Sequence, residues 1–120
     1  MTGDTVHFVV NLSISKGKFD AFESIARTMT AGSQKEPGTL GYDWYFSADR
    51  QHCRLLETYA DADSVLSHLT GPVVQDLVPE LLGTASLSSF EVYGDPGPKA
   101  MQMLAGFGAQ IFKPWHRLSR

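Results

Sequence analysis

The stretch from Glu36 to Tyr59, EPGTLGYDWYFSADRQHCRLLETY, constrains the fold of this chain more than any other. A Glu-Pro-Gly turn opens it, and apolar side chains then recur at every second position, the period of a β-strand whose two faces meet different surroundings. Turn-forming residues from Ser47 to Gln51 separate two such runs, so the stretch predicts a hairpin. One face of the first strand would carry Leu40, Tyr42, Trp44 and Phe46, and one face of the second Cys53, Leu55, Glu57 and Tyr59.

The elements expected around this hairpin follow from the periods of the apolar residues and from capping residues. Their order, strand, helix, strand, strand, helix, strand, is that of a ferredoxin-like α+β sandwich, in which helices cover one side of an antiparallel sheet. In the last strand, Leu87 is expected to share a face with Ser89 and Glu91, opposite Phe90 and Val92. The elements are a strand from Thr5 to Ser15, a helix from Phe19 to about Gly32, the hairpin, a helix capped by Asp61 and interrupted at Gly71-Pro72, a segment broken by Pro79, and a strand from Ser86 to Tyr93.

The chain has the size and composition of one domain spanning residues 1–120, since 42% of its 120 residues are hydrophobic. Residues 94–120 form an apolar C-terminal extension, which we expect to pack on the domain or on a neighbouring subunit. The helices leave one sheet face open, and the strand from Thr5 to Ser15 presents apolar side chains there too. A second copy of the chain is the simplest cover, so we expect a homodimer.

Charge and cysteine content exclude several classes of function. The net charge is −3 and the basic residues are scattered, so no basic stripe is available for nucleic acid. Cys53 is the single cysteine, and no Cys/His cluster has the spacing of a zinc site. The N-terminus lacks the pattern of a secretory signal, and no apolar run is long enough to span a membrane. We expect a cytoplasmic protein without nucleic-acid or membrane partners.

Three passages carry a resemblance to a known family: EPGTLGYDWY, LLETYADADSVLSHL and FEVYGDP. Together they make the region from Thr5 to Gly94 resemble the antibiotic biosynthesis monooxygenase family of dimeric α/β barrel proteins. The resemblance implies that two ferredoxin-like subunits pair sheet to sheet into a barrel, with a pocket in each subunit between sheet and helices. The apolar second face of the first strand agrees with such pairing.

The resemblance also implies an activity. Enzymes of the family oxidise phenolic or quinol-type substrates with molecular oxygen as co-substrate and without metal, flavin or haem, whereas other members have no known reaction. We therefore expect a cofactor-independent monooxygenase acting on a small aromatic ligand. The alternative is a non-catalytic dimeric protein of the same fold that binds a small ligand or serves in a stress response.

Four side chains are candidates for catalysis. His68 falls where the family often carries a histidine near the pocket, and imidazole is the side chain that exchanges protons near neutral pH. Asn11 could hold a substrate or peroxide oxygen through its amide. Glu57 and Tyr59 share a strand face, where a half-buried carboxylate beside a phenol could accept or orient a proton. Each has a structural alternative: His68 could face solvent, Asn11 could bond to backbone, and Glu57 and Tyr59 could form a structural hydrogen bond or salt link.

Trp44 and Tyr42 are candidates for substrate binding, although both could instead be large residues of the core or of a dimer interface. The segment from Asn11 also resembles the first strand of the haem-degrading branch of the same superfamily. By spacing, its tryptophan position corresponds to His68 and its iron-binding histidine to Val78, which cannot ligate a metal. Haem oxygenation is therefore not expected.

Overall fold

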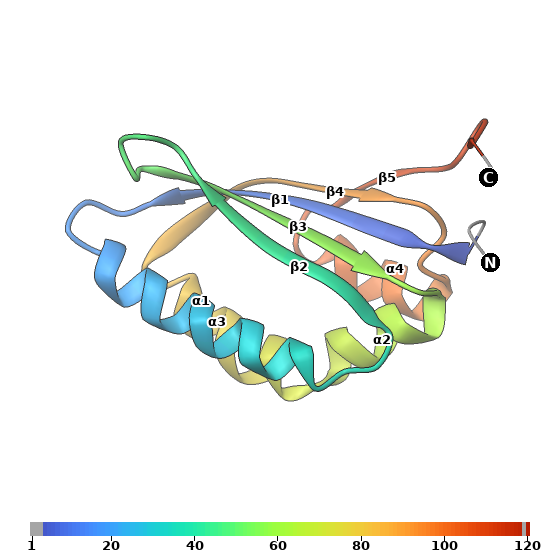
Figure 1. Cartoon of the computed structure of the whole chain (residues 1–120), viewed down its shortest axis with the longest axis horizontal. Coiled ribbons are helices and arrows are strands. Elements are labelled where there is room, and N and C mark those ends of the chain that lie inside the picture. Colours follow the sequence, from blue (N-terminus) through green and yellow to red (C-terminus); the bar gives the residue numbers. More distant parts are fainter. Residues whose placement is uncertain (1–3, 119) are drawn as a thin grey trace.

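The computed structural model describes residues 4–118 and 120. Its elements follow the expected order, with a helix and a short strand added at the C-terminal end (Figure 1). They are β1 (Val6–Ile14), α1 (Phe19–Gln34), β2 (Thr39–Phe46), β3 (His52–Tyr59), α2 (Ala62–Thr70), the π-helix η2 (Val73–Leu77), α3 (Val78–Leu81), β4 (Ala85–Tyr93), α4 (Pro98–Ala105) and β5 (Gln110–Phe112).

The strands form a five-stranded sheet in the order β2-β3-β1-β4-β5. The central strand β1 pairs antiparallel with β3 and β4, β2 pairs antiparallel with β3, and β5 adds a parallel edge beside β4. All helices lie on one side of this sheet (Figure 1), which confirms the ferredoxin-like α+β architecture. The sheet of one chain stays open, so closure into a barrel with a second copy stays a prediction.

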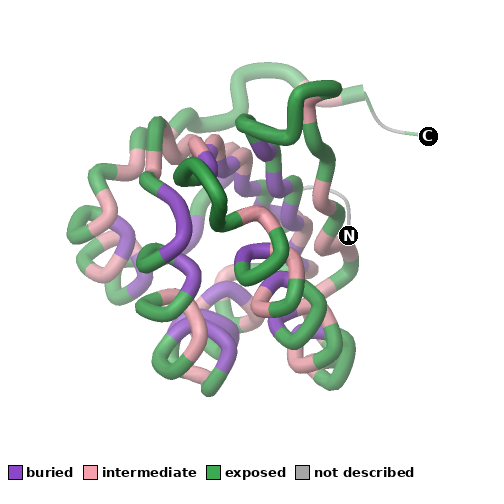
Figure 2. The backbone as a smooth tube through the Cα atoms, turned by 90° about the vertical axis from the view of Figure 1, so that its left-hand side faces the viewer, coloured by how far each residue is buried: buried purple, intermediate pink, exposed green. Residues whose placement is uncertain are grey.

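The core lies where the helices face the sheet, and Figure 2 shows the buried stretches on these inner sides. Every second residue of β1, from Val6 to Ile14, is at most 9% exposed. These side chains pack against Phe22, Ala26 and Met29, the inward stripe of α1. Full burial of one such aliphatic or aromatic side chain stabilises the fold by roughly 1.5–3 kcal/mol, so this layer holds the helices to the sheet.

Two β-bulges change the faces on which residues of β2 and β4 were expected to lie. The register between β2 and β3 shifts between Thr39 and Gly41, and Leu40 is 60% exposed, so the prediction that Leu40 shares the face of Tyr42 and Trp44 is wrong. The register between β1 and β4 shifts after Asn11, which pairs Leu87 with the buried Leu12 and puts it on the face of Phe90. A bulge inserts one residue and thereby inverts the alternation beyond it.

The helical segment after the hairpin is built from three short pieces. Asp61 caps α2 as expected, because its Oδ1 accepts hydrogen bonds from the backbone N–H and the hydroxyl of Ser64. The chain turns at Gly71-Pro72 and continues as η2, and Pro79 lies in the first turn of α3, where its missing N–H costs nothing. No helix among residues 4–118 and 120 is long and apolar enough to cross a membrane.

Candidate functional site

A cavity of about 60 Å³ lies between the sheet and the helices. It crosses the sheet beneath four neighbouring strands, since its lining includes Tyr42 of β2, Glu57 of β3, Phe8 of β1 and Phe90 of β4. The β4 end is its mouth: Leu82 there is 39% exposed, and its neighbours Leu87, Phe90 and Phe107 are partly exposed. The cavity is therefore apolar at its mouth and polar at its inner end.

His68 reaches this inner end from α2. Val65, His68 and Leu69 are the buried residues of that helix, and their i, i+3, i+4 spacing places all three on the face turned toward the sheet. His68 is 2% exposed, and its ring packs between the rings of Tyr42 and Tyr59, with centroid separations of 5.6 and 5.2 Å. The expected alternative of a solvent-facing histidine does not apply.

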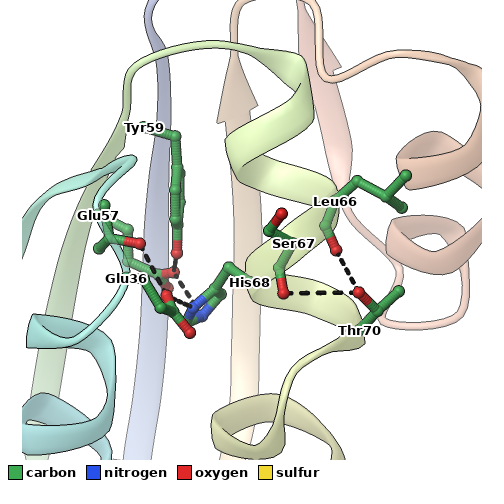
Figure 3. Close-up of polar contacts among 8 residues, drawn as sticks. Glu36, Glu57, Tyr59, Leu66, Ser67, His68 and Thr70 are labelled. Carbon is green, nitrogen blue, oxygen red and sulfur yellow. Dashed lines mark hydrogen bonds and ion pairs between the residues drawn. The ribbon is translucent and has the colours of Figure 1, made fainter.

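Two carboxylates meet the two nitrogens of this ring (Figure 3). Nδ1 of His68 lies 2.7 Å from Oε1 of Glu36, whereas Nε2 lies 3.6 Å from Oε1 of Glu57. The same oxygen of Glu57 accepts a short hydrogen bond from the hydroxyl of Tyr59. Glu36, Glu57, Tyr59 and His68 thus form one connected cluster, which we call the acid–base cluster.

Burial determines the electrostatics of this cluster. It raises the pKa of Glu57, and the nearby His68 and the hydrogen bond from Tyr59 only partly oppose this effect. Burial and the adjacent Glu57 also raise the pKa of Tyr59 and of Tyr42 well above the ordinary value of a phenol. Both tyrosines therefore remain neutral hydrogen-bond donors at physiological pH, and Glu57 is a carboxylate that can hold a proton.

The structure brings four of the six predicted site residues together. His68, Glu57 and Tyr59 belong to the acid–base cluster, and Tyr42 lines the cavity beside them. Trp44 does not line the cavity; its indole N–H donates to the hydroxyl of Thr30 on α1 at 2.8 Å.

Asn11 lies on the opposite, open face of the sheet. The residues before and after it on β1, Val10 and Leu12, are buried on the side of the helices. The Nδ2 of Asn11 donates a hydrogen bond to the hydroxyl of Ser89 at 2.6 Å. Its Oδ1 is buried without a hydrogen-bond partner among the described residues. Asn11 therefore cannot contact a molecule bound beside His68 in the same chain.

Glu36 is the site residue that the sequence analysis missed. It belongs to the Glu-Pro-Gly turn, which was interpreted only as the start of the hairpin. The turn packs against α2: the carbonyl of Gly38 accepts from the N–H of Ala60, and a Cβ at Gly38 would lie 2.0 Å from Oγ of Ser64. The contact to His68 joins residues 32 positions apart, and no local pattern predicts it.

This arrangement is suited to proton transfer beside an apolar cavity. Among the described residues, no group of His, Cys, Asp and Glu side chains could hold a metal ion. Val78, at the position of the iron ligand in the haem-degrading branch, lines the cavity and has no ligand atom. An apolar cavity of about 150 Å³ holds benzene, so a cavity of about 60 Å³ accepts an aromatic ring only after its mouth widens.

Comparisons with known proteins agree with this fold. A family model described as antibiotic biosynthesis monooxygenase matches residues 5–80, whereas no match is found among curated proteins. The crystal structure of MupZ from Pseudomonas fluorescens is 28% identical, with a TM-score of 0.78 over 98% of this chain and 95% of MupZ.

Two further solved structures share the fold at lower identity. SnoaB from Streptomyces nogalater, described as a cofactor-independent oxygenase, is 18% identical, with a TM-score of 0.68 over 79% of this chain and 96% of SnoaB. Rv0793 from Mycobacterium tuberculosis is also 18% identical, with a TM-score of 0.68 over 78% of this chain and 97% of that one.

Proposed function

The chain belongs to the antibiotic biosynthesis monooxygenase family, and from this premise we propose that it is a cofactor-independent monooxygenase that oxidises a small phenolic or quinol-type aromatic with molecular oxygen. The observation that carries the proposal is the acid–base cluster at the inner end of an apolar cavity. The description of SnoaB as a cofactor-independent oxygenase, on the same fold, supports it.

The first step is removal of a proton from the substrate hydroxyl. Nε2 of His68, the ring nitrogen on the side of the cavity-lining Glu57, accepts this proton, and the resulting imidazolium lies between the side chains of Glu36 and Glu57. The phenolate that forms is electron-rich enough to react with oxygen directly. The neutral hydroxyl of Tyr42, which also lines the cavity, can donate a hydrogen bond to the phenolate oxygen.

The remaining steps need no further oxidant. The phenolate passes one electron to O2, and the two radicals combine to form a carbon–oxygen bond. The peroxide anion takes back the proton that His68 accepted, and the resulting hydroperoxide eliminates water, made of its outer O–H group and the ring hydrogen on the same carbon, so that a carbonyl remains on the ring. The substrate supplies all four electrons that reduce O2, one oxygen atom enters the product and the other becomes water. The apolar walls keep bulk water from the intermediates.

Substrate binding must widen the cavity at its mouth. Leu82, which directly follows α3, and Phe107, which stacks on Phe90 with ring centroids 6.0 Å apart, are both partly exposed at this mouth. The hydroxyl of a bound ring would then point inward toward His68.

Oxygen uptake tests the proposed function. Purified protein is incubated with a panel of hydroquinones and hydroxylated polycycles, and uptake is compared for the wild type, His68→Gln and the control His116→Gln, whose histidine is exposed near the C-terminus. We expect uptake above the protein-free rate, unchanged in H116Q and reduced by about 10²–10⁴-fold in H68Q, the usual contribution of a general base. Tight ligand binding without uptake above the protein-free rate would establish the non-catalytic alternative.

A further inference from the structure

We propose that Glu36 is a positioning residue, which holds His68 in the tautomer that carries its proton on Nδ1 and leaves Nε2 free to accept the proton of the substrate. The inference rests on the proposed function for its kinetic consequence. Its structural content, which ring nitrogen carries the proton, can be measured without any turnover.

The two contacts of the ring differ in a way that assigns the proton (Figure 3). An ionised carboxylate can only accept hydrogen bonds, so the 2.7 Å contact between Oε1 of Glu36 and Nδ1 of His68 requires a hydrogen on Nδ1. The separation of 3.6 Å between Nε2 and Oε1 of Glu57 is too long for a hydrogen bond. Nε2 therefore needs no hydrogen, and its lone pair lies on the side of Glu57, which lines the inner end of the cavity.

Glu57 makes no hydrogen bond to the ring, because its Oε1 lies 3.6 Å from Nε2. Its Oε1, the oxygen nearest to Nε2, already accepts the hydroxyl hydrogen of Tyr59, which is itself 0% exposed. If Glu36 were absent, Nδ1 would lose its acceptor, and the neutral ring would gain most by moving its hydrogen to Nε2 and donating to Glu57. That tautomer blocks the lone pair that the proposed reaction uses.

Glu36 is itself held in place on the far side of the ring from the cavity. The hydroxyl of Thr39 donates to its Oε1 at 2.7 Å, its backbone N–H donates to the carbonyl of Ser33 at 3.0 Å, and it forms no ion pair with a described Lys or Arg. Its side chain is 20% exposed, whereas that of His68 is 3% exposed. These contacts hold Oε1 of Glu36 beside Nδ1 of His68.

Glu36 lies at the edge of the sheet away from the mouth of the cavity. Glu36 precedes β2, at one edge of the sheet, whereas the mouth of the cavity lies under β4. In the order β2-β3-β1-β4, three strand spacings of about 4.8 Å, roughly 14 Å in all, lie between the two. Glu36 does not line the cavity, so it acts on the substrate only through His68.

Nitrogen-15 NMR of the two ring nitrogens of His68 tests the tautomer directly, with Glu36→Ala, Glu36→Gln and the exposed control Glu80→Ala compared with the wild type. We expect a protonated Nδ1 and an unprotonated Nε2 in the wild type and in E80A, and the reverse in E36A. A wild-type ring protonated on Nε2 alone, or an E36A ring that keeps the wild-type pattern, would overturn the inference even if no substrate were found.

Kinetics supply the second readout. In E36A we expect kcat to fall by at least about tenfold with KM unchanged, because the ring loses its working tautomer while the cavity keeps its shape. The side chain of E36Q presents either a carbonyl or an amide N–H to Nδ1, and we expect its activity to follow whichever tautomer NMR reports. If the activity of E36Q did not follow the tautomer that NMR reports for it, the inference would be overturned, because Glu36 would then act through its charge and not by setting the tautomer of His68. Absence of uptake in the wild type would count against the proposed function and leave the NMR result to decide the inference.

Discussion

Glu57 is the residue whose burial has the clearest measurable cost. Glu57 is 5% exposed, and burial raises the pKa of its carboxyl group above the ordinary 4.5. Over a range of pH the carboxyl is therefore protonated in the folded chain but ionised in the unfolded chain. The contribution of Glu57 to the free energy of unfolding is thus fully present below pH 4.5. It declines as the pH rises toward the pKa that this carboxyl has in the folded chain.

Replacement of Glu57 by the non-titrating glutamine should reveal this decline. We predict that the free energy of unfolding of the wild type relative to E57Q falls as pH rises above 4.5, by about 1.4 kcal/mol for each tenfold change in proton affinity between the folded and unfolded states. Urea unfolding at a series of pH values measures it, with exposed Glu80→Gln as the control. A wild-type stability relative to E57Q that is independent of pH, or that rises with pH, would contradict a raised pKa of Glu57 in the folded chain.

At this scale the sequence predicted most residues of the cluster but not the contacts between them. His68, Glu57, Tyr59 and Tyr42 were identified from strand alternation and from the family resemblance, and they do come together. Glu36 was missed because the contact joining it to His68 depends on how the turn packs on α2. Asn11 lies on the wrong face for this cavity, which its position on β1 could have indicated, since it alternates with the buried Val10 and Leu12.

Among the elements, the Glu-Pro-Gly turn matters more than its length suggests, because it positions Glu36. Alternation of apolar residues was enough to predict β1 and both hairpin strands. The bulges at Leu40 and beside Leu87 were not predictable from the sequence. An apolar residue at a bulge continues the alternation of apolar residues in the sequence, although the side chains beyond the bulge point to the other face of the sheet. The strand β5 has only three residues, too few for a period to show.

The packing of this turn on α2 can be tested with a double substitution. A Cβ at Gly38 would lie 2.0 Å from Oγ and 2.5 Å from Cβ of Ser64, so Gly38→Ala should destabilise the fold by about 1–3 kcal/mol. Ser64→Gly removes both atoms, and we predict that the double variant is more stable than the sum of the two single losses implies. Denaturant unfolding of the four proteins measures the coupling, and strictly additive losses would exclude the contact.

For the molecule as a whole, the main feature is the face of the sheet that no helix covers. Near its centre Val9 of β1 pairs with Leu56 of β3, which is 39% exposed, and Tyr45 on β2 is 55% exposed. Trp115, on the segment that follows β5, is 95% exposed. The face also carries polar side chains, since Asn11 donates a hydrogen bond to Ser89 there. The homodimer expected from the family resemblance would cover it.

Light scattering at micromolar concentration tests this assembly. We predict a mass twice the 13.2 kDa of one chain for the wild type, and a shift toward the single-chain mass for Leu56→Glu, which puts a charge at the centre of the open face. Thr28→Glu, on the exposed side of α1, is the matched control and should stay dimeric. A wild type with the mass of one chain would contradict sheet-to-sheet pairing.

The most direct test of the proposed oxygenation is the origin of the new oxygen atom. A substrate found by oxygen uptake is turned over under ¹⁸O₂ in unlabelled water, and the product is analysed by mass spectrometry, with product incubated in labelled water as the control for exchange. We predict one ¹⁸O atom in each product molecule and loss of this incorporation in H68Q. Product that carries oxygen from water, or no new oxygen, would contradict the assignment of this chain as a monooxygenase.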